Sequence, residues 1–208
     1  MDYDKINNYI KELYNGKEEM TKNKFSENTE IKDFIPVIDD DVSRFLKIII
    51  SIKKPLNILE IGTSIGYSAV SMASEAKKYG GNVFTIEYDE KVANQAMKNF
   101  EKAGLKNIQL LKGDAREIIP NINEKFDLIF QDTDKKLYSE LFNKCIDILN
   151  LGGLFIAEDV LFPVIDLEEK WHDLIEPIKN FNDSAVKCKY IESTILPIGD
   201  GVMLAVKK

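Results

Sequence analysis

The chain has 208 residues, of which 44% are hydrophobic, enough for one sizeable core and short for two domains. Its 28 basic and 35 acidic side chains give a net charge of −7, which disfavours broad binding to a nucleic-acid backbone. No apolar run approaches the roughly 20 residues of a membrane span, the amino terminus lacks an apolar signal core, and the two cysteines lack metal-site spacing. We therefore expect a cytoplasmic protein with a single domain over residues 1–208 and no membrane partner.

Residues 1–50 are predicted to form a helical segment ahead of the main fold. Short amphipathic helices are expected over residues 2–20 and 26–34, and Pro36 interrupts the helical pattern after the second. A third helix follows, with an aspartate among residues 39–41 as its cap and apolar side chains at helical spacing. These additional helices lead us to expect a homodimer.

From residue 55 onward, strand-like and helix-like segments alternate. Strands are predicted at 56–61, 83–87, 107–111, 126–131 and 153–158, and helices at 66–79, 89–103, 115–119 and 137–149. This alternation predicts parallel strands joined by crossover helices, and therefore a three-layer α/β fold over residues 55–208. The tail differs, because β-rich segments at 185–195 and 202–207 are joined by a connection too short for a crossover. We expect them to pair as an antiparallel hairpin, which completes a seven-stranded, mainly parallel sheet with helices on both faces.

The most informative stretch is residues 58–68, Ile-Leu-Glu-Ile-Gly-Thr-Ser-Ile-Gly-Tyr-Ser. It is typical of a buried strand, a tight glycine turn and a helix N-terminus that together face a ligand. Glu60 lies inside the predicted strand, where a carboxylate is costly unless a cation or a hydrogen-bond donor meets it. Glu87 closes the next apolar run, at the position where nucleoside-binding folds hold ribose hydroxyls.

The glycine spacing indicates which nucleoside is bound. Dinucleotide-binding folds use Gly-x-Gly-x-x-Gly so that backbone amides can contact a pyrophosphate. Here Thr63 and Ser64 follow Gly62, so the middle glycine is absent. A cofactor with a ribose, no pyrophosphate and a positive charge near Glu60 fits better, and S-adenosylmethionine meets these conditions. An NAD-dependent oxidoreductase is the disfavoured alternative, and a strand-turn-helix without any ligand would explain the glycines alone.

Further acids lie where later predicted strands end. Asp114, Asp132 and the pair Glu158–Asp159 each come at a carboxyl end, the edge where open α/β sheets bind ligands. Converging carboxylates repel one another unless a cation compensates, so they predict a hard divalent metal bound through oxygen. Lys135, three residues past Asp132, is a candidate proton acceptor. Each acid taken singly would also fit a capping or solvated carboxylate.

These motifs resemble those of the cation-dependent O-methyltransferases, the family of the catechol and caffeoyl-CoA O-methyltransferases. The resemblance runs from about Phe34 to the end and rests on residues 58–68, 85–87, 113–115, 126–135 and 152–161. Residues 3–10 and 197–201 are similar to the bacterial methyltransferases of 5-hydroxyuridine at the tRNA wobble position. The resemblance implies a Rossmann-like class I methyltransferase fold, S-adenosylmethionine as cofactor, and Mg²⁺, Mn²⁺ or Ca²⁺ as an assisting cation.

The resemblance also implies which residues contact the cofactor. Glu87 would bind the ribose hydroxyls, and Asp114 and Ala115 would meet the adenine. The methionine part would lie beside the remaining predicted contacts, namely Ile38, Glu60, Gly62, Thr63, Ser68 and Asp132.

For catalysis, the resemblance implies Asp132 and Lys135, with Lys135 as the base. Asp132, Glu158 and Asp159 would be the metal ligands. The family usually has Asp-Asn where this chain has Glu158-Asp159, so three anions replace two and a bound divalent ion would leave the site near −1. Because each added anion weakens the metal's ability to acidify a hydroxyl, a protein that binds the cofactor without catalysis is an open alternative. The expected methyl acceptor is either a phenolic, catechol-like small molecule or 5-hydroxyuridine in a tRNA anticodon loop.

Overall fold

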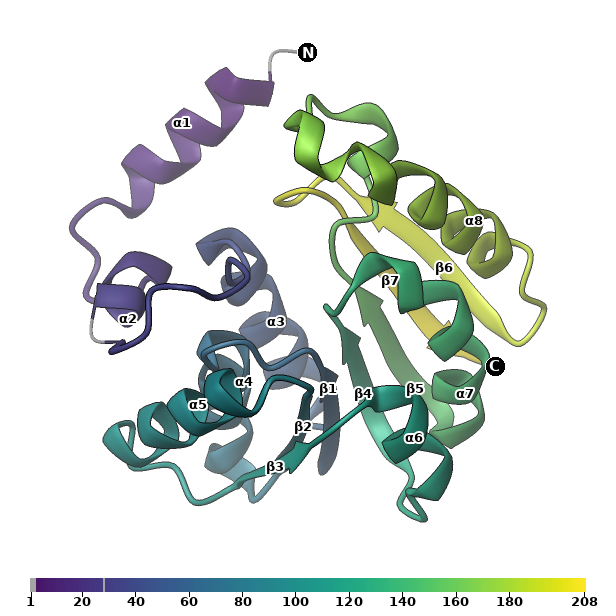
Figure 1. The fold of residues 1–208 in the computed structure, drawn as a ribbon, viewed down its shortest axis with the longest axis horizontal. Helices are drawn as coiled ribbons and strands as arrows, with labels where there is room; N and C mark the ends of the chain where they lie inside the picture. Colours follow the sequence, from purple (N-terminus) through teal and green to yellow (C-terminus); the bar gives the residue numbers. More distant parts are fainter. Residues whose placement is uncertain (1–2, 28) are drawn as a thin grey trace.

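The computed structural model describes residues 3–27 and 29–208, and a single seven-stranded sheet organises them (Figure 1). The strands are β1 Asn57–Ile61, β2 Asn82–Glu87, β3 Ile108–Lys112, β4 Phe126–Gln131, β5 Leu149–Ala157, β6 Ile191–Leu196 and β7 Val202–Lys207. Their order across the sheet is β3-β2-β1-β4-β5-β7-β6. The first five strands pair in parallel, whereas β7 pairs antiparallel with both β5 and β6. The predicted, mainly parallel sheet with a C-terminal hairpin is therefore confirmed.

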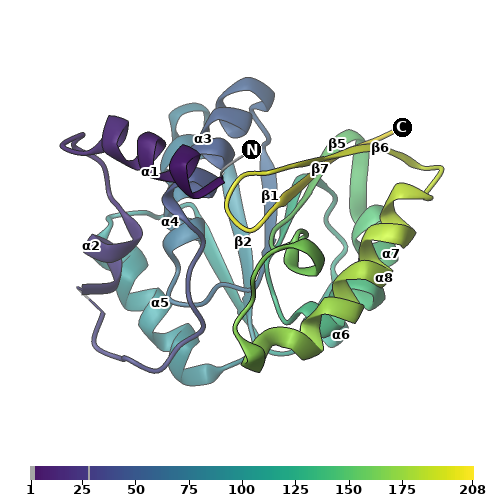
Figure 2. The ribbon, with the colours of Figure 1, turned by 90° about the horizontal axis from the view of Figure 1, so that it is seen from above.

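Helices cover both faces of this sheet. Their bounds are α1 Tyr3–Tyr14, α2 Lys22–Glu27, α3 Asp40–Lys53, α4 Tyr67–Ala76, α5 Glu90–Lys102, α6 Ala115–Ile118, α7 Tyr138–Ile148 and α8 Ile175–Val186. Helices α3, α4 and α5 lie on one face, and α6, α7 and α8 lie on the other (Figure 2). Each face buries its own apolar cluster, around Leu46 and Phe100 on the first and Phe142 and Phe181 on the second. Strands covered on both sides must be apolar almost throughout, which explains the continuous hydrophobic runs in the sequence.

The amino-terminal helices are shorter than predicted. The helix expected over residues 2–20 ends at Tyr14, and Gly16 follows in the left-handed conformation with a φ of 85°. Residues 1 and 2, which that prediction touches, lie outside the described residues. None of the helices in residues 3–27 and 29–208 has the length and apolar character that crossing a membrane requires.

The helix predicted over residues 26–34 is wrong. Helix α2 ends at Glu27, and residues 29–39 form no helix. Contacts with distant parts of the chain hold this segment: Lys98 Nζ lies 2.6 Å from Glu30 Oε2, and Ser64 Oγ donates to the Ile35 carbonyl at 2.9 Å. Ile35 also precedes proline, a position biased away from helix. Tertiary contacts therefore override the amphipathic pattern here.

A helix was missing from the sequence-based assignment of the tail. Helix α8 covers residues 175–186, and β6 begins at Ile191 rather than at the predicted residue 185. Ile178, Phe181 and Ala185 point into the core and are fully buried. This helix packs against β6 and, through Phe181, against Phe155 of β5, and thereby completes the second helical layer.

The strand order places a candidate site at the carboxyl ends of the central strands. The chain moves outward from β1 to β3 and then returns to the other side of β1 with β4, so β1 and β4 flank a topological switch point. Their ends stay in register, because the Asp132 N–H donates to the Ile61 carbonyl at 2.9 Å. The Glu158 N–H donates to the Gln131 carbonyl at 3.2 Å, which continues the β4–β5 pairing by one residue. The residues that follow β1, β4 and β5 are thus neighbours.

Candidate active site

Glu60 is a fully buried acid in β1, directly before the switch point. Its Oε2 accepts a hydrogen bond from Thr85 Oγ1 at 2.5 Å, whereas its Oε1 has no hydrogen-bond partner among the described residues. Burial raises the pKa of Glu60 to about 8, although the nearby hydroxyls of Ser68 and Thr85 act to lower it. A buried carboxyl group with one unpaired oxygen is costly, and a cationic amino group is the type of ligand that would remove this cost.

Replacing Glu60 with glutamine should remove the part of the pH dependence of the ligand-free protein's stability that comes from this buried carboxyl group. Because the folded-state pKa is about 8 and the ordinary value is 4.5, the folded chain holds a proton that the unfolded chain has released between these limits. Wild-type stability therefore falls as pH rises from about 4.5 to about 8. By pH 9 the variant should be more stable by roughly 3–5 kcal/mol, or about 10 °C in melting temperature.

Thermal melting between pH 5 and pH 9 would test this expectation. S-adenosylmethionine should raise the wild-type melting temperature and leave that of the Glu60→Gln variant almost unchanged, because the carboxylate that pairs with the cofactor's amino group is absent. If the melting temperatures of the two proteins changed equally with pH, the raised pKa of Glu60 would be contradicted.

The turn after β1 is shaped for close approach of backbone and ligand. Gly62 and Gly66 have φ values of 97° and 93°, which side-chain-bearing residues rarely adopt. Between them, Ser64 also has a left-handed φ, of 48°, and its N–H donates to Glu87 Oε2 at 2.8 Å. Thr63 is buried, and its hydroxyl lies 2.5 Å from that of Thr85. An amide of this turn is thus occupied by a carboxylate of the chain, which supports the expectation of a ligand without a pyrophosphate.

Glu87 ends β2 beside this turn. Its Oε1 accepts from the Asp89 N–H at 2.9 Å and its Oε2 from Ser64, so backbone amides fix the orientation of the carboxylate. Burial raises the pKa of Glu87 in spite of these hydrogen bonds. Each carboxylate oxygen has a second lone pair, so Glu87 can still accept hydrogen bonds from two ribose hydroxyls.

Asp114 and Ala115 lie next to Glu87, because the Gly113 N–H donates to the Glu87 carbonyl at 2.8 Å. Asp114 caps α6 by accepting from the Arg116 N–H at 2.8 Å, and the Arg116 guanidinium lowers the pKa of Asp114. The carboxylate of Asp114 therefore has a structural partner besides any ligand.

Two further predicted cofactor contacts, Ile38 and Ser68, come from the other helical layer. Ile38 is buried two residues before α3, and Ser68 is buried as the second residue of α4. Both side chains belong to the helical layer that packs over β1.

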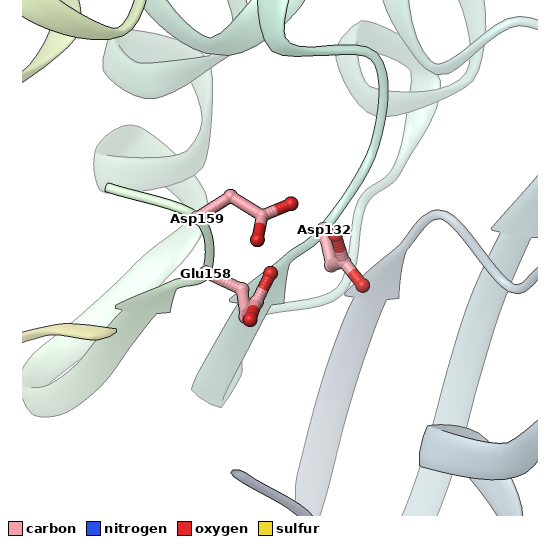
Figure 3. Close-up of side chains that lie close together, drawn as sticks. All are labelled: Asp132, Glu158 and Asp159. Atoms are coloured by element: carbon pink, nitrogen blue, oxygen red, sulfur yellow. The ribbon is translucent and has the colours of Figure 1, made fainter. Parts of the chain in front are cut away.

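Asp132, Glu158 and Asp159 gather at the ends of β4 and β5 (Figure 3). One carboxylate oxygen from each lies within 4.8 Å of the others. Burial, and then the neighbouring Asp159, raise the pKa of Glu158 well above its usual range. Asp159 adopts a φ of 62°, a left-handed conformation in which aspartate and asparagine are enriched. Three convergent carboxylates of this kind fit a hard divalent cation.

Lys135 lies between two of these carboxylates. Its Nζ is 2.8 Å from Asp132 Oδ1 and 2.7 Å from Asp159 Oδ2. Burial disfavours the charged amine, but Asp132 and the other acids outweigh that effect and raise the pKa of Lys135 well above its ordinary value. The lysine is therefore protonated in this state, and it can accept a proton only when the surrounding negative charge has been neutralised.

Sequence reasoning missed three contributors to this site. Thr85 is the hydrogen-bond donor to Glu60, and its signal was a polar residue in an apolar strand, directly opposite Glu60 in the β1–β2 register. Ser64 supplies an amide to Glu87. Tyr138 contacts Glu158 and Lys135 of the acidic site, and its only sequence signal was its position three residues after Lys135 at the start of a helix.

Comparisons with known proteins identify the family and the fold of the chain. A family model described as O-methyltransferase matches residues 11–208. Catechol O-methyltransferase from Niastella koreensis is 33% identical over 183 residues, which cover 82% of each chain. A solved structure from Staphylococcus aureus is 25% identical, with a TM-score of 0.85 over 100% of both chains. An O-methyltransferase from Bacillus cereus in complex with SAH, 24% identical, has the same fold, with a TM-score of 0.77 over 96% of this chain and 97% of that one.

Proposed function

The chain belongs to the O-methyltransferase family, and we propose that it transfers a methyl group from S-adenosylmethionine to a hydroxyl oxygen of a catechol-like small molecule, assisted by a divalent cation. The relative named catechol O-methyltransferase supports this class of acceptor. The net charge of −7 disfavours a polyanionic RNA as the acceptor. Family membership also argues against the dinucleotide-dependent oxidoreductase considered from the glycine pattern.

One observation carries the proposal. The unpaired buried oxygen of Glu60 and the cluster of three carboxylates with Lys135 lie at the ends of adjacent strands, on either side of the switch point. A methyl donor with a cationic amino group and an acceptor that needs deprotonation would therefore meet at one edge of the sheet.

Different residues of the cofactor site would bind different parts of the expected ligand. Glu60 Oε1 can accept from the amino group of the methionine part, and Glu87 from the ribose hydroxyls. When bound, S-adenosylmethionine supplies an activated methyl group, and the divalent cation supplies positive charge close to the acceptor oxygen. The chain's own task is to orient the two reactants and to hold or accept a proton at Lys135 Nζ.

The acidic cluster has the charge that a divalent cation needs. With all three carboxylates ionised and Lys135 protonated, the cluster carries a net charge of −2, which one divalent cation cancels. The expectation of a residual −1 left out Lys135, whose ammonium contacts two of the three acids. Neutralising the three carboxylates would also lower the pKa of Lys135, because their negative charge is what raises it. Lys135 can accept a proton only under that condition.

Incubation with labelled S-adenosylmethionine and a simple catechol such as 3,4-dihydroxybenzoate would test the function. We expect a methylated product whose formation stops with EDTA and resumes with Mg²⁺ or Mn²⁺. Bulk tRNA containing 5-hydroxyuridine is the competing acceptor, followed by mass spectrometry of its nucleosides. Methylation of the uridine but not of the catechol would reassign the acceptor. Protection from melting by the cofactor without any product would favour binding without catalysis.

Replacing Asp159 with asparagine should weaken Mn²⁺ binding about tenfold, because the site loses one negative charge and keeps an oxygen ligand. Asparagine tolerates the φ of 62° at this position, so the backbone should not change. Calorimetric titration with Mn²⁺ would measure the effect. Asp173→Asn, which breaks an exposed ion pair with Lys136, is the matched control and should bind Mn²⁺ like the wild type. Equal or tighter Mn²⁺ binding by Asp159→Asn would argue against Asp159 as an anionic ligand.

A further inference from the structure

Tyr138 is a fully buried tyrosine at the first position of α7, and it contacts Glu158 and Lys135 of the acidic site. Its hydroxyl lies 3.1 Å from the carbonyl oxygen of Gln131 and 3.1 Å from that of Glu158. A single hydroxyl hydrogen is therefore shared between two backbone acceptors that belong to different strands.

One of these acceptor carbonyls belongs to the residue before a predicted metal ligand, and the other belongs to a predicted metal ligand itself. Gln131 is the last residue of β4 and is followed by Asp132, whereas Glu158 follows β5 and precedes Asp159. One backbone hydrogen bond, from the Glu158 N–H to the Gln131 carbonyl, continues the strand pairing at this point. The hydroxyl of Tyr138 is thus a second connection between the strand ends, on which the spacing of the carboxylates depends.

Tyr138 is itself held rigidly. The Gln131 side-chain amide donates to the Tyr138 carbonyl at 3.3 Å, so β4 holds both ends of this residue. The ring packs edge-to-face on Phe181 of α8 with a centroid distance of 5.2 Å. Its face lies 5.1 Å below Lys135 Nζ, which adds a cation–π contact to the two ion pairs of that lysine.

We propose that Tyr138 is a positioning residue that sets the separation of Asp132 from Glu158 and Asp159, and with it the affinity of the cluster for a divalent cation. This inference rests on the proposed function, because it concerns the same acidic cluster. It assigns a role to the hydroxyl group in particular, since the ring alone would fill the space and contact Lys135. Groups that orient metal ligands typically change metal affinity 10–100-fold when they are removed.

The test is a comparison of Tyr138→Phe with wild type by calorimetric titration with Mn²⁺ alone. Phenylalanine keeps the ring and loses only the hydroxyl, so we expect Mn²⁺ binding weaker by about 10–100-fold. Affinity for S-adenosylhomocysteine should stay within about threefold, because Glu60 and Glu87 do not contact Tyr138. Tyr138→Leu, which also removes the contact with Lys135, should bind Mn²⁺ at least as weakly as Tyr138→Phe.

Tyr67→Phe is the matched control. Tyr67 is also almost completely buried, and its hydroxyl lies 2.7 Å from Asp40 Oδ1 and 3.1 Å from the Met20 carbonyl, away from β4 and β5. It should lose stability through its lost hydrogen bonds but keep wild-type Mn²⁺ affinity.

The outcomes separate this inference from the proposed function. Wild-type Mn²⁺ affinity in Tyr138→Phe, or an equal loss in Tyr67→Phe, would overturn the role of Tyr138 alone. Absence of Mn²⁺ binding by the wild-type protein would overturn both the metal-assisted function and this inference.

Discussion

Replacing Lys135 with methionine should lower the rate of methyl transfer by about 10²–10⁴-fold, the usual contribution of a positioned acid or base. Methionine has a similar length and no charge, so the variant loses both the proton acceptor and the counter-ion of Asp132 and Asp159. Binding of S-adenosylmethionine should change little, since Glu60 and Glu87 are untouched. Steady-state kinetics with a catechol acceptor would therefore show the loss in kcat, with a much smaller change in the cofactor KM.

Two further variants separate charge from proton transfer. Lys135→Arg keeps a positive counter-ion for Asp132 and Asp159 but has too high a pKa to accept a proton, so it should not restore turnover. Lys136→Met is the positional control, because Lys136 is the adjacent lysine and its side chain forms an exposed pair with Asp173. It should retain wild-type kinetics. A rate for Lys135→Met within tenfold of the wild type, or full activity in Lys135→Arg, would rule out Lys135 as the proton acceptor.

The grouping of the strand-end acids was predictable because it follows from topology alone. Alternating strands and helices force parallel pairing, and parallel strands bring their carboxyl ends to one edge of the sheet. Glu60 in β1 and Glu87, Asp132 and Glu158 at the ends of their strands were therefore expected near one another before any side-chain position was known. The glycine turn was predictable because glycine readily adopts a left-handed φ, and Gly62 and Gly66 both do so.

The contacts inside the site could not be predicted, because they join residues far apart in the sequence. Lys135 contacts Asp159, 24 positions later, and Tyr138 contacts the Glu158 carbonyl, 20 positions later. Both depend on how α7 begins relative to β5, which no local pattern specifies. The protonated state of Lys135 follows from these contacts, and the sequence, which predicted a proton acceptor, gave no sign of it.

Helix α8 was missed because its local preferences are weak. It contains Pro177 in the first turn and three poor helix formers, Asn180, Asn182 and Asp183. Its stability comes from packing, since Ile178 and Phe181 are fully buried against the sheet and α7. Most helical stability in proteins has this tertiary origin, and the amphipathic spacing was the available signal.

Replacing Gly62 with alanine should destabilise the protein by roughly 2–5 kcal/mol and abolish cofactor binding at micromolar concentrations. A left-handed φ costs a non-glycine residue about 1–2 kcal/mol, and overpacking adds about 1–3 kcal/mol. The overlap here is with backbone: a Cβ on Gly62 would overlap the Asp132 carbonyl oxygen and lie 2.7 Å from the Asp132 carbonyl carbon. Because Asp132 is fixed to β1 by a hydrogen bond to Ile61, relief requires that the ends of β1 and β4 separate.

Gly80→Ala separates the destabilisation caused by steric overlap from that caused by a left-handed φ in a non-glycine residue. Gly80 has a φ of 85°, close to that of Gly62, but a Cβ there would meet nothing within 4 Å. This variant should lose only the conformational contribution, about 1–2 kcal/mol, and should bind S-adenosylhomocysteine like the wild type. Urea denaturation and calorimetric titration of both variants give the two quantities. If Gly62→Ala were no less stable than Gly80→Ala and bound the cofactor normally, the end of β4 would not lie against this turn. The acidic cluster would then have no fixed position relative to the methyl donor, since Asp132 is the residue that connects them.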